Sequence, residues 1–122
     1  MAVSESFRLY ALEQLARVVT GDIRSRRMFG GVGVYAGERF FALIDDDIVY
    51  LKADDLTVPA FEAEGLAPFR PFGEGTKPMK YYTVPGEWLD DVEALGPWAA
   101  RALEAAARGK KSRTKGRSRG TS

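Results

Sequence analysis

Residues 23–52 constrain the fold most, because short apolar runs alternate there with residues that favour tight turns. The runs predict four strands, over residues 23–28, 32–35, 39–44 and 48–52. The turn residues between them are Gly30 with Gly31, then Gly37, then Asp45, Asp46 and Asp47. Strands joined by links this short must run mostly antiparallel. Residues 40–44 are apolar on both faces of their strand, which predicts a central position in the sheet.

Helical patterns lie on both sides of this region. The N-terminal pattern spans residues 4–19, where Ser4 can accept hydrogen bonds from free backbone N–H groups and Gly21 can end the helix. Its apolar face is formed by Phe7, Ala11, Leu15 and Val18. Residues 57–64 predict a short helix with Thr57 as its cap, followed by a loop and a strand over residues 79–84.

The C-terminal pattern predicts a helix over residues 87–108, with Asp90 or Asp91 as its cap. Pro97 lies in the middle of this helix, where it removes a backbone donor, so we expect a kink or a restart at that position. The order of all these elements predicts an α+β fold of two layers, in which helices pack on a mostly antiparallel sheet.

The composition narrows the chemistry that the chain can perform. It has no His and no Cys, which excludes disulfides, thiolate metal sites and catalysis by those two side chains. We expect no metal and no cofactor. No apolar run approaches the roughly 20 residues that span a bilayer, and the N-terminus lacks the basic-then-apolar pattern of a signal peptide. We therefore expect a cytoplasmic protein that has no membrane partner.

Charge divides the chain into two parts. Residues 109–122 hold no acid and six cations, which are Lys110, Lys111, Arg113, Lys115, Arg117 and Arg119. Because the whole chain has a formal net charge of +1, residues 1–108 carry −5. We expect one domain over residues 1–108 and a basic tail over 109–122 that is disordered by itself. The tail is a candidate for weak, sequence-independent nucleic-acid binding; a solubilising tail, or one that folds back on the acidic domain, is the alternative.

Several short motifs occur in order along residues 5–108. They are Arg27-Met28-Phe29-Gly30-Gly31, Gly33-Val34-Tyr35, Phe41-Ala42-Leu43, Tyr50-Leu51-Lys52-Ala53-Asp54, Tyr81-Tyr82 and Trp98-Ala99. Together they resemble the N-terminal domain of the TfoX/Sxy family. The resemblance implies a fold similar to type III secretion chaperones. Full-length members of the family look like regulators of competence genes that act with the cyclic-AMP receptor protein. Full-length members carry a second domain related to helix-hairpin-helix DNA binders, where this chain has its basic tail, and the family offers no catalytic residues.

The main candidate for a partner-binding site is basic. On a strand, Arg24 and Arg26 share one face and Arg27 takes the other. Further cations that could join them are Lys52, Lys77 and Lys80. Such a cluster suits an acidic partner or a phosphate backbone, and the alternative is an edge strand whose charge prevents aggregation. The residues that we expect to contact a partner are Arg24, Arg27, Met28, Phe29 and Lys52.

Other conspicuous groups have structural explanations that we favour over functional ones. The glycines at 30, 31 and 33 precede a strand, which indicates a bulge or a close backbone approach rather than a phosphate cradle. The three aspartates at 45–47 indicate a solvated turn rather than a cation site. The aromatic residues that could stack on bases are Tyr81, Tyr82, Phe69 and Phe72. Alternation puts Tyr81 and Tyr82 on opposite faces, so core packing is the better interpretation, as is packing of a helix for Trp88.

These observations favour a non-enzymatic interaction module, a regulatory adaptor that acts in transcriptional regulation, with a homodimer through a sheet or helix surface as one arrangement. The alternative is a small nucleic-acid-binding protein that uses the tail together with the arginine-rich strand. The third hypothesis is an enzyme. Without His or Cys, acid–base chemistry would fall to carboxylates or to residues such as Lys52 and Tyr82.

Overall fold

The computed structural model describes residues 3–28, 30–71, 73, 75 and 78–120, and the side chains of these residues up to Gly109. Its helices are α1 (Glu5–Val18), α2 (Val58–Ala63), α3 (Gly86–Leu89) and α4 (Val92–Gly120). Its strands are β1 (Ile23–Met28), β2 (Gly31–Ala36), β3 (Arg39–Asp45), β4 (Ile48–Lys52), β5 (Pro68–Phe69) and β6 (Met79–Thr83). The predicted α+β fold is confirmed.

All six strands form one antiparallel sheet in the order β1-β2-β3-β4-β6-β5. The strand β3 is central, as its two apolar faces predict, and β1 and β5 are the edges. The strand β5 lies in a segment that the sequence predicts to be a loop. Pro68 is tolerated there because an edge strand does not need the N–H group that proline lacks.

Tight turns fix the pairing of the central strands. The β2–β3 turn contains Gly37 at a φ of 62°, as predicted. The β3–β4 turn contains Asp46 and Asp47 at φ values of 54° and 57°. Two consecutive residues with positive φ form a type I′ turn, whose twist matches that of the strands it joins. The Asp47 carboxylate also accepts the N–H of Ser4 at 2.8 Å, so this turn holds the start of α1.

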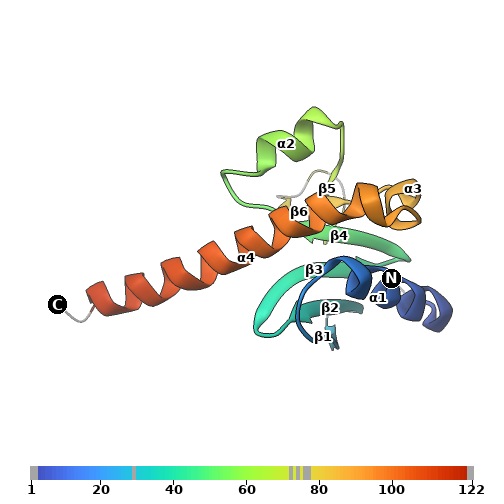
Figure 1. Ribbon diagram of the computed structural model, residues 1–122. Coiled ribbons are helices and arrows are strands. Elements are labelled where there is room, and N and C mark those ends of the chain that lie inside the picture. The colour runs from blue at the N-terminus through green and yellow to red at the C-terminus, as the bar shows by residue number, and fades with distance from the viewer. Residues whose placement is uncertain (1–2, 29, 72, 74, 76–77, 121–122) are drawn as a thin grey trace.

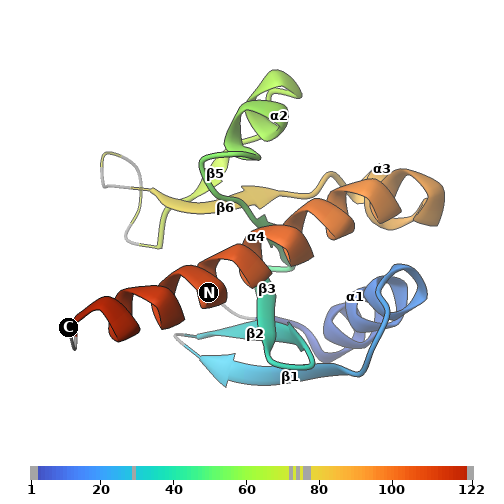
Figure 2. The same cartoon turned by 60° about the vertical axis from the view of Figure 1, so that its left-hand side comes forward.

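Helices α1, α3 and α4 lie on the same face of the sheet (Figures 1 and 2). Helix α4 packs across β3 and β4, with α1 beside it. The core lies between these helices and the sheet, and its largest fully buried side chains include Leu15, Phe41, Phe61, Ile44, Leu51 and Leu95. Helix α2 lies at the β5–β6 end of the sheet (Figure 1). Across the described residues, no helix has the length and apolar character needed to cross a membrane.

The cap of α1 is as predicted and the cap of α2 is not. Ser4 Oγ accepts the N–H of Phe7 at 3.2 Å. Thr57 makes no side-chain cap bond to α2. Its hydroxyl accepts the N–H of Asp54 at 3.0 Å instead, and the Asp54 carboxylate accepts the N–H groups of Leu56 and Thr57. The predicted cap fails because Pro59, at the second position of α2, has no N–H to donate, and the Thr57 hydroxyl accepts the N–H of Asp54.

The break between α3 and α4 lies at Asp90 and Asp91. Of the kink or restart predicted at Pro97, the restart is wrong, because α4 continues through that residue, and the kink stays a prediction. Asp91 Oδ1 accepts the N–H of Glu93 at 3.0 Å, so Asp91 caps α4 as predicted. Pro97 lies inside α4, where it deprives only the carbonyl of the exposed Glu93 of an intrahelical bond, and water can replace that bond. The backbone of α4 continues to Gly120, beyond the edge of the sheet (Figure 2). The division of the chain at residue 108 stays a prediction.

A two-pronged ion pair fixes α4 to the loop between β4 and α2. Arg108 donates from Nε to Asp54 Oδ2 at 2.6 Å and from Nη2 to Asp54 Oδ1 at 3.0 Å. The Asp54 side chain is 27% exposed and that of Arg108 is 38% exposed. The hydrogen bond from Arg108, together with its charge and the backbone donors of Thr57 and Leu56, outweighs burial and lowers the pKa of Asp54 from 3.8 to about 2.

This pair makes the stability of the fold depend on pH at the acid end. A depressed carboxyl pKa stabilises the folded state above the unfolded pKa and ceases to do so as the pH falls towards 2. We expect Asp54→Asn to lower the free energy of unfolding by about 1–2 kcal/mol at neutral pH, a value reduced for solvent screening, and to have little effect near pH 2. Urea unfolding at a series of pH values measures the difference.

The neighbouring carboxylate provides the control. Asp55 pairs with Lys80 at 2.6 Å, but its side chain is 89% exposed, and exposed pairs contribute little. Asp55→Asn is expected to leave stability nearly unchanged at every pH. A loss in Asp54→Asn that persists unchanged down to pH 2 would contradict the assignment to the ion pair.

Candidate functional site

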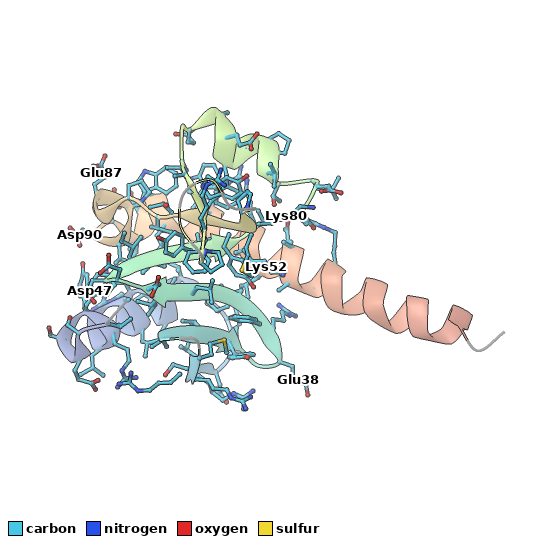
Figure 3. The ribbon with its side chains drawn as sticks, turned by 180° about the vertical axis from the view of Figure 1, so that it is seen from behind. Glu38, Asp47, Lys52, Lys80, Glu87 and Asp90 are labelled. Atoms are coloured by element: carbon cyan, nitrogen blue, oxygen red, sulfur yellow. The ribbon has the colours of Figure 1, made fainter. Side chains whose placement is uncertain are left out.

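The sheet has a second face, which the helices do not cover in the described part of the chain. We call it the outer face, and Figure 3 is viewed from this side. Because side chains alternate along each strand, residues between those of the core project onto it. They are Arg24, Arg26, Met28, Gly31, Gly33, Tyr35, Phe40, Leu43, Asp45, Ile48, Tyr50, Lys52, Phe69, Met79, Tyr81 and Thr83. The outer face is thus mainly apolar and aromatic.

Aromatic rings pack against one another across this face. The ring centroids of Tyr35 and Phe40 lie 4.9 Å apart in a stacked arrangement, and those of Phe40 and Tyr81 lie 5.8 Å apart. Lys52 Nζ lies 5.2 Å from the centroid of the Tyr81 ring, a distance typical of a cation–π contact. Burial raises the pKa of the Tyr81 hydroxyl to about 12. This hydroxyl therefore stays protonated at neutral pH.

An apolar pocket of about 540 Å³ opens on the outer face. Phe40 and Leu43 of the central strand β3 lie among its lining residues, with Met28 from the edge strand β1. The β5–β6 region supplies Phe69, Pro71 and Met79, and β2 and β3 also contribute Val32, Ile44 and Asp45. The volume falls in the range of pockets that bind small molecules or large side chains. Among the described lining residues, Asp45 is the only titratable one.

Two glycines make room for this arrangement. A Cβ atom on Gly31 would lie 2.6 Å from the backbone oxygen of Ile44. A Cβ atom on Gly33 would lie 2.7 Å from Met28 Cε and 3.0 Å from Phe40 Cε1. Gly31 faces backbone and therefore needs glycine, whereas the nearest atom at Gly33 is the end of the flexible Met28 side chain. The predicted close approach is confirmed, and it serves the pocket.

The structure brings only some of the predicted contact residues together. Arg24 and Met28 share the outer face of the edge strand β1, and Arg27 lies on the opposite face of that strand. Arg24 Nη2 donates to the carbonyl of Gly37 at 2.7 Å. Lys52 lies on the outer face of β4, three strands away from β1 (Figure 3). Phe29 lies outside the described residues.

Most of the other cations and aromatic residues considered from the sequence lie away from this site or outside the described residues. Lys80 is on the helix side of β6, where it pairs with Asp55, and Lys77 and Phe72 lie outside the described residues. Tyr82 belongs to the core and stacks on Phe61 at 5.3 Å. Trp88 stacks on Trp98 at 4.9 Å, so its predicted packing role is confirmed. The side chains of the tail cations lie outside the described part, and their nucleic-acid binding stays a prediction.

Sequence reasoning missed the pocket residues Phe40, Leu43 and Met79. A signal for the first two was present, because residues 40–44 are apolar on both faces of a strand. A strand of this kind needs cover on two sides, and the structure supplies helices on one. No comparable signal marks Met79, which reaches the pocket only through the pairing of β6 with its neighbours.

Comparison with known protein families gives a match over most of the chain. The family model described as the TfoX N-terminal domain matches residues 13–106. The matched range contains all six strands and every residue that lines the pocket. A search of curated proteins finds no match to the chain.

Proposed function

The chain belongs to the TfoX N-terminal domain family, and from that premise we propose that it is a regulatory adaptor in the cytoplasm that binds a protein partner through the outer-face pocket. The observation that carries the proposal is an apolar pocket of about 540 Å³ on a sheet face without helices. A pocket of this kind suits an apolar side chain from a partner segment.

The side chains of the lining favour recognition of a peptide. Met28 and Met79 are flexible and polarisable, so they adapt to the shape of a bound side chain. Phe40 and Phe69 offer rigid apolar area at a small entropic cost. Met79 is 43% exposed, and a partner that covers it removes apolar surface from water.

The same geometry favours binding over catalysis. General acid–base chemistry needs titratable groups within hydrogen-bond reach of one another and of a substrate. Lys52 and Tyr82, the pair considered from the sequence, lie on opposite faces of the sheet. The apolar lining beside Asp45 offers a place to bury a side chain, and we propose no reaction there.

A charge placed in the pocket tests the proposal. We expect Met79→Glu to weaken binding of a peptide selected from a random display library against the full chain by at least about tenfold, because a buried unpaired carboxylate opposes binding. Fluorescence anisotropy with the labelled peptide measures the dissociation constant.

Leu56 offers a matched control, since it is 72% exposed and is not among the pocket residues. Leu56→Glu is expected to bind the selected peptide like the unmodified chain. Equal weakening in both variants, or none in Met79→Glu, would place the binding site elsewhere.

A further inference from the structure

We infer that the segment bound by the pocket is extended and acidic: an apolar side chain enters beside Met28, and carboxylates at alternate positions face Arg26 and then Arg24. This inference rests on the proposed function, because it names the chemistry of the partner at the same site. The juxtaposition that carries it is an apolar pocket directly beside a row of cations on one strand edge.

Positive charge lies beside the pocket on the outer face. Arg24 and Arg26 of β1 and Lys52 of β4 project from it, and Asp45 is the acid that shares it among the described strand residues. The ion pairs found among the described residues all involve side chains of helices or of the helix side, as in Arg8–Glu5, Arg17–Glu13, Lys80–Asp55 and Arg108–Asp54. Arg24 and Arg26 thus place two positive charges beside the pocket residue Met28, although residues 1–108 as a whole are acidic.

The spacing of side chains along β1 matches that of an extended partner segment. Arg24, Arg26 and Met28 occupy successive positions of one strand face, about 6.5–7 Å apart. Met28 lines the pocket, and Arg26 is exposed and has no ion pair within the described part of the chain. An extended segment has the same repeat, so an apolar residue against Met28 places its second and fourth neighbours opposite Arg26 and Arg24.

The same charges argue against a second copy of this chain as the occupant. A twofold contact brings the same surface of both copies together. Across the outer face this would set the arginines of β1 near the cations of the partner copy, and like charges at an interface disfavour it. An acidic segment, in contrast, carries the opposite charge and is attracted to this face.

Three synthetic peptides that share an apolar centre test the inference with the full chain. They carry glutamate, glutamine or lysine at the second and fourth positions after the apolar residue. We expect the glutamate peptide to bind about tenfold more tightly than the glutamine peptide at low salt, and the lysine peptide to bind most weakly. High salt is expected to narrow these differences, because the charged groups are exposed.

The strand itself supplies the matched variants. Arg26→Glu is expected to reverse the order of the glutamate and lysine peptides. Arg27→Glu changes the same charge on the opposite face of β1 and is expected to preserve the order. If Arg27→Glu acts like Arg26→Glu, the effect comes from overall charge and the inference is wrong.

The remaining outcomes separate the inference from the function on which it rests. If all three peptides bound the full chain with equal affinity and none bound Met79→Glu, the preference for an acidic partner would be wrong, but the pocket would remain the binding site. Failure of all three to bind would overturn the pocket as well. A single-stranded oligonucleotide that displaces the glutamate peptide at equal concentration would replace the peptide by a phosphate chain as the partner.

Discussion

Replacement of Phe61 by alanine is expected to lower the free energy of unfolding by about 3–5 kcal/mol. Phe61 is fully buried, and its ring lies 5.3 Å from that of Tyr82 and 4.9 Å from that of Trp98. It is the one buried residue of α2, and a helix of six residues has no stability without its tertiary contacts. The substitution therefore both opens a cavity in the core and removes the contacts that hold α2 against it. Urea unfolding followed by circular dichroism measures the loss.

Leu56→Ala is the control for this substitution. Leu56 precedes α2 by two positions and is 72% exposed, so the same type of truncation is expected to change stability by no more than about 0.5 kcal/mol. A loss in Phe61→Ala below about 1 kcal/mol would show that α2 does not depend on this contact.

The second large effect is expected at Gly31. A Cβ atom there lies 2.6 Å from the carbonyl oxygen of Ile44 on the paired strand. The backbone of β3 at Ile44 cannot move aside without disturbing the pairing of β2 with β3. Gly31→Ala is therefore expected to lower the free energy of unfolding by about 2–3 kcal/mol. At Gly33 the nearest atom is the end of the Met28 side chain. Because that side chain can change rotamer, Gly33→Ala is expected to destabilise less and to alter the pocket more.

Gly86 provides the comparison. A Cβ atom at Gly86 meets nothing within 4 Å, and alanine is expected to be neutral or slightly stabilising there because it restricts the unfolded chain. Thermal unfolding of Gly31→Ala, Gly33→Ala and Gly86→Ala ranks the three variants by stability. If Gly31→Ala and Gly86→Ala were equally stable, the close approach to Ile44 would not constrain residue 31.

The strands between Ile23 and Lys52 could be predicted because the information is local. Apolar runs fix the strands, and Gly37, Asp46 and Asp47 fix the turns, so each element is specified by residues within it. The two-residue β5 and the four-residue α3 are too short to carry a periodic pattern. Their existence depends on pairing with β6 and on packing against α4.

The candidate site was predicted less completely, for a physical reason. Alternation along β1 correctly separates Arg27 from Arg24, because that property belongs to one strand. Which face of a sheet the helices cover is decided by the packing of the whole chain, so the sequence could not show that Leu43 lines a pocket. The contribution of Met79 depends on a pairing between segments far apart in sequence.

Since every helix that packs on the sheet does so from one side, the two surfaces of this sheet are free to evolve at different rates. If the pocket binds a partner as proposed, substitutions at Met28, Phe40 or Met79 change recognition while Leu15, Leu51 and Leu95 preserve the core. The specificity of the pocket could then change while the chain stays folded throughout.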